Sequence, residues 1–239
     1  MRHGESAGNV ARNRALAERA ALIDIDARDC DVPLSELGER QARALGLWLP
    51  RNYERPKVLL ASPYLRARQT AQIALEAAGW TDVPTVADER LREKEFGILD
   101  RLTRTGIEQQ YPEQAAMRDS LGKFYYRPPG GESWTDVLLR LRSIIDTLTR
   151  EYSRQRVCIV SHQVVVLCFR YLLERMNETE ILAVDRANEI ANCSLTTYRF
   201  DPAAGTRGKL CLAGFNVVAP MEEAGAAVTT SPDVPVARK

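Results

Sequence analysis

The sequence has few of the residues that would point to a bound metal, a membrane or a nucleic acid. Its five cysteines and two histidines form no Cys-x-x-Cys pair and show no short spacing typical of zinc ligands. No apolar run approaches the length that crosses a bilayer. The 33 Lys and Arg residues nearly balance the 32 Asp and Glu residues, so overall charge provides no attraction to nucleic acid or to an anionic membrane. We therefore expect no metal, no nucleic-acid partner and no membrane partner.

The sequence also lacks a recognisable signal peptide, and its cysteine count is odd. Reduced thiols in the cytoplasm are the simplest interpretation. Cys158 and Cys168 lie in apolar runs and are expected to be small core side chains. Hydrophobic residues at 45% and charged residues at 27% are typical of a globular protein. A chain of this length fits a single α/β domain, and its oligomeric state stays open.

Strand and helix patterns alternate through the middle of the chain. Strands are expected where apolar and β-branched residues cluster, and helices where apolar residues recur with helical spacing after a serine N-cap. Ser62 and Pro63 are the expected N-cap and first residue of one helix. The alternation predicts a three-layer α/β/α sandwich with a mainly parallel central sheet. The expected strands are residues 57–61, 84–87 and 156–161, the last buried on both faces, and the expected helices are 35–50, 63–79, 133–152 and 163–175.

The remaining segments are less regular. Residues 10–30 are expected to form a helix or an excursion over the rim of a site, with their arginines on a solvated face. Residues 101–131 break into short helices, a cap over a pocket. Residues 193–200 and 209–218 predict a hairpin at the sheet edge. Residues 219–239 show no period, so we expect a disordered tail after a domain of residues 1–218.

Arg2, His3 and Gly4 form the tripeptide that points most directly to chemistry. A guanidinium binds two phosphate oxygens at once, glycine permits close approach of the backbone, and histidine attacks phosphorus as a nucleophile. Taken alone, the motif fits a solvated N-terminus equally well. The phosphate-binding interpretation gains support because Arg66 and His162 both follow expected strands. The carboxyl ends of parallel strands share one sheet edge, where helix N-termini favour anions.

Four motifs, in order along the chain, resemble those of the histidine phosphatase superfamily, the phosphoglycerate mutase-like clan. The resemblance runs from Arg2 to about Phe200, and the joint occurrence of the motifs is far more specific than any one of them. The matching segments are Arg2-His3-Gly4-Glu5-Ser6 with Asn9, residues 62–71, residues 91–97, and Val160-Ser161-His162.

The resemblance implies a role for each matching residue. His3 would be the nucleophile that becomes phosphohistidine. Glu93 would protonate the leaving oxygen and later activate water, with Glu89 and Glu95 as the nearby alternatives. Because phosphoryl transfer depends mostly on positioning and charge stabilisation, the cationic residues imply a reaction without a metal or another cofactor. The expected phosphate-binding residues are Arg2, Asn9, Arg66 and a protonated His162.

Part of the chain is similar to the fructose-2,6-bisphosphatase branch of the family. In that branch a basic, tyrosine-rich segment holds the sugar phosphate. Here the segment that contains Lys123, Tyr125 and Tyr126 has this composition, and it precedes the helix expected at residues 133–152. Leu167 stands where the branch carries an arginine, so a sugar bisphosphate is only suggested. The substrate-binding residues that this similarity implies are Arg118, Lys123, Tyr126 and Gln163.

The N-terminus departs from the family pattern, because a first strand should precede Arg2 and only Met1 does. Losing four or five buried side chains worth about 1.5–3 kcal/mol each would exhaust a typical stability of about 5–15 kcal/mol. We therefore expect that the native chain starts earlier, which an intact-mass measurement would show.

Three functions are consistent with these residues. The leading hypothesis is a metal-independent phosphatase that hydrolyses a small soluble phosphomonoester, such as a sugar phosphate, through a phosphohistidine. One alternative is phosphoglycerate mutase-type transfer, in which the phosphoryl group returns to another hydroxyl. The other is a catalytically silent phosphate-binding protein on the same scaffold.

Overall fold

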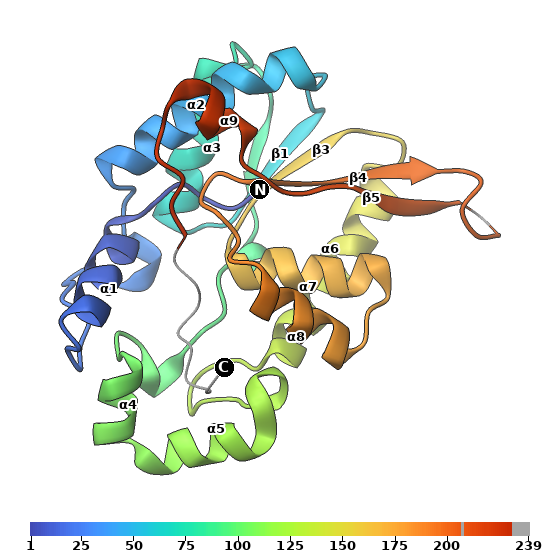
Figure 1. Ribbon diagram of the computed structural model, residues 1–239. Helices are drawn as coiled ribbons and strands as arrows, with labels where there is room; N and C mark the ends of the chain where they lie inside the picture. Colours follow the sequence, from blue (N-terminus) through green and yellow to red (C-terminus); the bar gives the residue numbers. More distant parts are fainter. Residues whose placement is uncertain (207, 231–239) are drawn as a thin grey trace.

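A parallel sheet of three strands lies at the centre of the computed structural model, which describes residues 1–206 and 208–230 (Figure 1). The strand order is β2-β1-β3, and Leu60 of the central strand lies between Val86 and Ile159 of its neighbours. The expected strand positions and the mainly parallel sheet are confirmed. The strands are β1 (Val58–Ala61), β2 (Thr85–Ala87) and β3 (Val157–Val160).

Helices cover both faces of this sheet. Successive side chains of a strand point to opposite faces, and in β1 Val58 and Leu60 pack into one core while Leu59 and Ala61 pack into another. The first core includes α6 and α7, and the second includes α3, which in turn packs on α2. The three-layer α/β/α sandwich is confirmed. These helices are α2 (Glu36–Asn52), α3 (Leu65–Ala77), α6 (Trp134–Glu151) and α7 (Gln163–Glu174).

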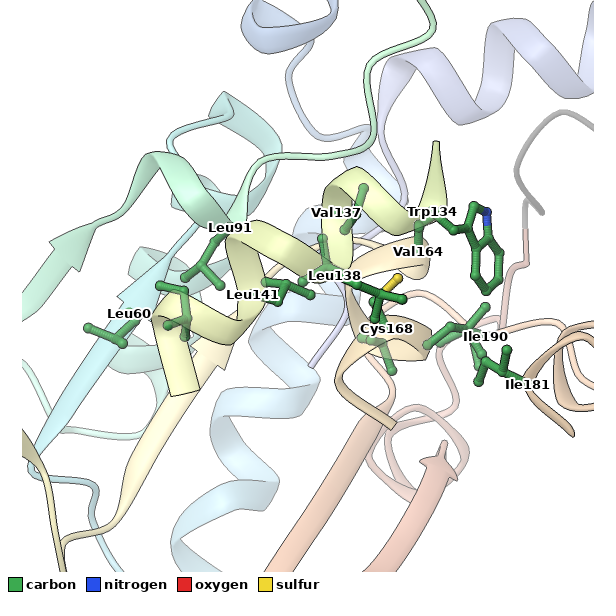
Figure 2. Packing of buried hydrophobic residues seen from close by; sticks show 14 of the residues in the cluster. Leu60, Leu91, Trp134, Val137, Leu138, Leu141, Val164, Cys168, Ile181 and Ile190 are labelled. Carbon is green, nitrogen blue, oxygen red and sulfur yellow. The ribbon is translucent and has the colours of Figure 1, made fainter. Parts of the chain in front are cut away.

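The larger core lies between the sheet and helices α6 and α7, and Figure 2 shows its side chains. Leu60 and Leu91 lie at one end of the cluster, and Trp134 and Ile181 lie at the other. Cys168 is fully buried among them, as expected. Full burial of one such side chain stabilises a fold by roughly 1.5–3 kcal/mol. This core therefore holds α6 and α7 against the sheet, and it fixes the position of the sheet's carboxyl edge.

Strand β3 is less buried than expected. Only Val160 is fully buried, whereas Val157, Cys158 and Ile159 are half-buried. Along its outer side, Met1 reaches only the last part of β3, where its nitrogen donates to the Ile159 carbonyl (2.6 Å). The first half of β3 therefore has less cover than a central strand. Cys158 packs against the core on the α3 side of the sheet, but it is half-buried rather than fully buried.

Residues 1–3 extend the sheet beside β3 for one short stretch. Arg2 forms a parallel bridge with Ser161, and the His3 amide donates to the Ser161 carbonyl (2.9 Å). On the other side, the Cys193 amide donates to the His3 carbonyl (3.2 Å). His3 thus lies at the same sheet edge as the carboxyl end of β3. The strand expected to precede Arg2 stays a prediction.

Serine caps start two of the covering helices where the sequence indicates. The Ser35 side chain accepts from the Gly38 amide at the start of α2, and Ser133 forms a capping box with Asp136 at the start of α6. The end of α2 differs from the expectation, because the helix continues past Pro50 to Asn52. A proline this close to a helix end removes few backbone hydrogen bonds.

The start of α3 also differs from the expectation. The helix begins at Leu65 rather than at Pro63, and Tyr64 is its N-cap. Ser62 does not cap the helix, since its hydroxyl lies 2.7 Å from Nε2 of His162. The Ser62 hydroxyl accepts from the Tyr64 amide (3.3 Å) before the helix begins, and it also bonds to this residue 100 positions away.

The expected late hairpin is present, but it forms its own two-stranded sheet. β4 (Leu195–Asp201) pairs antiparallel with β5 (Lys209–Val217), and Figure 1 shows the pair extending away from the helices. The residues just before β4 join the hairpin to the N-terminal stretch, since the Arg2 amide donates to the Ser194 carbonyl (3.3 Å).

The expectation of a disordered tail from residue 219 is wrong for the described part. Ala219–Ala224 form a short helix, α9, whose Met221 is fully buried against Leu45 and Trp48 of α2. Thr230 forms a bridge with Ala191. The domain therefore extends past residue 218, because long-range packing stabilises a helix too short to show a period. Residues 231–239 of the expected tail lie outside the described residues.

Further helices complete the described part of the fold. α4 and α5 form a lobe at the bottom of Figure 1, which fits the expected short helices of residues 101–131. Among the described residues, no helix combines the length and the apolar composition needed to cross a membrane. All five cysteines are free. These other elements are α1 (Ala7–Ala17), α4 (Arg104–Gln110), α5 (Pro112–Tyr125), α8 (Glu178–Ala187), and the 3-10 helices Asp29–Asp31, Glu89–Leu91 and Gly97–Leu99.

Candidate active site

The structure brings His3, Arg66 and His162 together at the carboxyl edge of the sheet. His3 ends the short stretch beside β3, His162 follows β3 as the N-cap of α7, and Arg66 lies in the first turn of α3 after β1. The two imidazole rings have centroids 5.0 Å apart. All three side chains are buried. This arrangement confirms that both strand-to-helix junctions and the N-terminal motif meet in one place.

A hydrogen bond to the backbone sets the tautomer of His3. Nδ1 lies 2.6 Å from the carbonyl oxygen of Gly4, and a carbonyl can only accept, so Nδ1 carries the proton and donates. Nε2 then keeps its lone pair, which is what a nucleophile needs. Burial first, and then the charges of Arg66 and Arg2, lower the pKa of His3 well below its ordinary value of 6.5. The imidazole is therefore neutral near pH 7.

Gly4 is needed for packing against the protein itself. Its amide donates to the Thr70 hydroxyl (3.0 Å), and a Cβ at this position would lie 2.6 Å from the carbonyl oxygen of Gly38 in α2. The glycine was expected to allow close approach to a phosphate. The structure instead assigns it to the contact between the motif and α2, which fixes the backbone that carries His3.

His162 is completely buried beneath this site. Its Nε2 lies 2.7 Å from the Ser62 hydroxyl, and its Nδ1 has no hydrogen-bond partner among the described residues. Burial first, and then Arg66, His3 and further arginines, lower the pKa of His162 well below 6.5. These surroundings favour a neutral ring. The protonated form expected from the resemblance stays a prediction for the phosphate complex, where an adjacent anion would raise the pKa.

Arg66 and Arg2 supply fixed positive charge. The Arg66 guanidinium donates to the carbonyl of Asp29 (2.5 Å) and forms an ion pair with its carboxylate (3.0 Å). It also lies over the ring of Tyr64, 4.9 Å from its centroid. Arg2 donates to the carbonyl of Ile190. Both guanidinium groups are thus held in place by the chain around them.

A pocket opens directly over His3. It is lined by several residues that the sequence motifs single out, together with a group of apolar residues. Asn9 lines it while its Oδ1 accepts from the Ser6 amide (3.0 Å), which orients the side-chain amide. The lining residues are Arg2, His3, Ser6, Gly8, Asn9, Arg12, Ile23, Ile25, Ala27, Asp29, Val32, Arg66, Glu93, Phe96, Leu99, Asp100 and Arg101.

Of the three candidate acid residues, only Glu93 faces this pocket. Its side chain is buried, and its Oε1 accepts from the Lys94 amide (2.8 Å). Glu95 is committed elsewhere, since it accepts from the Tyr64 hydroxyl (2.7 Å). Glu89 lies in a 3-10 helix and does not line the pocket. The geometry therefore favours Glu93 as the acid and base.

The four residues expected to bind the rest of the substrate do not line this pocket. Lys123 forms an ion pair with Asp185 (2.7 Å) and lies over the ring of Trp134. The Tyr126 hydroxyl donates to Gln114 (2.9 Å), and its ring packs in a small cluster with Leu99, Leu102 and Ile107. Arg118 and Gln163 are buried and are not among the lining residues. Their substrate-binding role stays a prediction.

Sequence reasoning missed two parts of the site. Arg12 was expected on a solvated face, but it is buried and lines the pocket. Its position three residues after Asn9 on α1 was the available signal, because residues three apart share a helix face. The other omission is the segment from Ile23 to Asp29, whose alternating pattern was visible in the sequence. No group of three or more His, Cys, Asp or Glu side chains among the described residues is placed to hold a metal ion.

Comparison with known proteins agrees with this geometry. A sequence model described as the histidine phosphatase superfamily (branch 1) matches residues 1–209, and the chain belongs to this family. A solved structure shares the fold. The structure of mycobacterial glucosyl-3-phosphoglycerate phosphatase, in complex with inorganic phosphate, superposes on this chain with a TM-score of 0.67 at 24% identity, over 92% of this chain and 96% of that one.

Two curated relatives show the range of reactions in the family. A 6-phosphofructo-2-kinase/fructose-2,6-bisphosphatase of Caenorhabditis elegans is 32% identical over 183 residues, 73% of this chain and 38% of that protein. A 2,3-bisphosphoglycerate-dependent phosphoglycerate mutase 2 of Gloeobacter violaceus is 36% identical over 133 residues, 55% of this chain and 59% of that protein. The chain is similar to only part of each relative, so their full activities do not transfer to it.

Proposed function

We propose that this protein is a phosphatase that hydrolyses a small soluble phosphomonoester through a phosphohistidine at His3. The observation that carries the proposal is the 2.6 Å hydrogen bond from Nδ1 of His3 to the Gly4 carbonyl. It leaves the Nε2 lone pair available at a buried position beside Arg2 and Arg66. A neutral histidine among fixed cations suits attack on a phosphate dianion.

The first half of the reaction forms the Nε2–P bond and breaks the P–O bond to the alcohol. Arg2 and Arg66 stabilise the charge on the equatorial oxygens, and the Nδ2 group of Asn9 is a further donor. Glu93 gives its proton to the leaving oxygen, so the alcohol departs neutral. In the second half, water attacks phosphorus, Glu93 takes its proton, and the Nε2–P bond breaks to release inorganic phosphate.

Release of inorganic phosphate from a panel of phosphate esters, measured in EDTA, tests this proposal. Release that persists in EDTA and disappears in His3→Ala is the expected result. The matched control is Arg14→Ala, an exposed residue of the same N-terminal region that forms an ion pair with Glu18. Turnover that survives in His3→Ala would contradict the proposal. Phosphoester binding without turnover in the unmodified chain would favour the silent phosphate-binding protein.

A mutase is the second candidate, because the curated relatives include a phosphoglycerate mutase. It would keep the phosphohistidine until another hydroxyl accepts the phosphoryl group. Label that stays on the protein, with slow hydrolysis and rapid transfer to an added phosphoglycerate, would identify a mutase. Rapid release of inorganic phosphate would exclude it as the main activity. The cytoplasm stays the proposed location, with the free cysteines as its support.

A further inference from the structure

Residues 21–28 form a largely extended segment that leads into the 3-10 helix at Asp29, and half-buried and exposed positions alternate over residues 21–29. The odd-numbered residues are half-buried and the even-numbered ones are exposed. Every odd-numbered residue from 23 to 29 lines the pocket: Ile23, Ile25, Ala27 and Asp29. Alternate side chains of an extended chain point to opposite sides, so one face of this segment is a continuous wall of the pocket.

Backbone hydrogen bonds attach this wall to the loop after the Glu93 motif. Leu22 forms an antiparallel bridge with Leu102, and the Ile23 amide donates to the Arg101 carbonyl (2.8 Å). The Arg101 guanidinium donates in turn to the Ile25 carbonyl (2.8 Å). The Thr103 amide donates to Ala21 (3.0 Å). The segment is therefore held on both sides of Ile23 and presents a defined surface.

Three of the four residues of this wall, Ile23, Ile25 and Ala27, are apolar, whereas Asp29 carries the carboxylate that pairs with Arg66. Ile23, Ile25 and Ala27 share the lining with Phe96 and Leu99 of the facing loop. The residues proposed to hold the phosphate, Arg2, His3 and Arg66, line the same pocket. The alcohol portion of an ester bound by them would lie in a pocket that these apolar side chains share.

We propose that the wall of Ile23, Ile25 and Ala27 binds the alcohol portion of the ester, and that the protein selects phosphomonoesters whose alcohol carries an apolar chain or face. This inference rests on the proposed phosphatase function and names its substrate class. Lys123, which the family resemblance implied as a substrate-binding residue, pairs with Asp185 and does not line the pocket. Arg12 and Arg101 also line the pocket, so esters with a second anion belong in the test.

A series of n-alkyl phosphates tests the inference directly, because ethyl, butyl and hexyl phosphate have leaving groups of similar reactivity. Burial of a methylene group strengthens binding by about 0.8 kcal/mol, which corresponds to roughly a fourfold rise in kcat/KM for each added carbon that reaches the wall. We expect hexyl phosphate to be a better substrate than glycerol phosphate or 3-phosphoglycerate. A flat series, or a preference for 3-phosphoglycerate, would overturn the inference while leaving the phosphatase function intact.

Two substitutions in the segment distinguish a loss of the apolar contact with the substrate from a general loss of activity. Ile25→Ser should lower the ratio of kcat/KM for hexyl phosphate to that for ethyl phosphate by roughly tenfold. Asp24→Ser changes the neighbouring residue on the exposed face and should leave this ratio unchanged. An equal ratio in Ile25→Ser and the unmodified protein would contradict the inference. Absence of phosphate release from every ester by the unmodified protein would overturn the proposed function itself, and this inference with it.

Discussion

Arg66 forms an ion pair with Asp29 inside the pocket where it is expected to bind phosphate. The two side chains approach to 3.0 Å, and the Arg66 side chain is 7% exposed whereas that of Asp29 is 42% exposed. Asp29 ends the apolar wall, 37 positions before Arg66 in the chain. Its carboxylate therefore occupies donors that a phosphate would use, and a bound phosphate must compete with it.

Replacing this carboxylate should tighten the binding of anions. Asp29→Asn removes a negative charge beside the phosphate site and releases the Arg66 guanidinium. Because the pair is partly exposed and screened, we expect the inhibition constant of inorganic phosphate to fall by roughly two- to fivefold. Competitive inhibition of ester hydrolysis by inorganic phosphate measures this constant.

Asp31→Asn is the matched control for that experiment. Asp31 lies in the same 3-10 helix, but it pairs with Arg28 on the surface (2.7 Å). The Asp31→Asn substitution should leave the inhibition constant of inorganic phosphate unchanged. Weaker inhibition in Asp29→Asn would show that Asp29 orients Arg66 for phosphate rather than competing with it.

Acidification should destabilise the protein through its two histidines. Burial lowers the pKa of both His3 and His162 well below 6.5, so the native state stays neutral where the unfolded chain takes up protons. The free energy of unfolding is therefore highest above about pH 6.5 and falls as the pH drops through this value. The slope contributed by both residues is at most about 2.7 kcal/mol per pH unit.

Urea denaturation between about pH 7.5 and pH 5.5 measures this slope. The chain contains only these two histidines, so the variant carrying both His3→Gln and His162→Gln should show a flatter profile. An identical slope in the variant would assign the acid sensitivity to other groups. Saturating phosphate should oppose the loss, because its negative charge favours the protonated imidazole.

Substitution of the acid should affect catalysis according to the leaving group. Glu93→Gln removes the proton donor, and for an alkyl ester we expect kcat to fall by roughly a hundredfold to ten-thousandfold. The loss should be smaller for an aryl phosphate, since a phenolate leaves without a proton. Glu95→Gln is the control, because Glu95 accepts from Tyr64 instead of facing the pocket. A larger loss in Glu95→Gln would transfer the role to that residue.

Two leucines of α6 test the account of the core. Leu141 is fully buried, so Leu141→Ala should reduce the free energy of unfolding by roughly 2–5 kcal/mol. Leu139 is 62% exposed, and Leu139→Ala should change it by less than about 0.5 kcal/mol. Equal effects, measured by chemical denaturation, would show that α6 packs through another face.

The parts of the fold that were predictable from sequence have local causes. β1 is a short apolar run, and the N-cap of α6 depends on Ser133 and the three residues after it. Such features involve neighbours in the chain, so a pattern of residues suffices to place them. The positions of Arg66 and His162 at one sheet edge followed from the parallel topology, whereas that of His3 was expected from the family resemblance.

The features that sequence reasoning missed depend on contacts between distant residues. Ser62 has the local pattern of an N-cap, yet its hydroxyl bonds to His162. Met221 supports a helix only because α2 offers it a buried site. The pairing of Asp29 with Arg66 has no local signature at all. The alternation of residues 23–29 was visible, but nothing in the sequence showed that it faced a pocket.

Trapping of the covalent intermediate tests the central claim most directly. The protein would be mixed with a phosphate ester, quenched in alkali to preserve phosphohistidine, and digested for mass spectrometry of the N-terminal peptide. The account predicts a phosphoryl group on Nε2 of His3 that is lost in acid and is absent from the His3→Ala variant. Turnover without any phosphorylated peptide, or with the phosphoryl group on another residue, would contradict it.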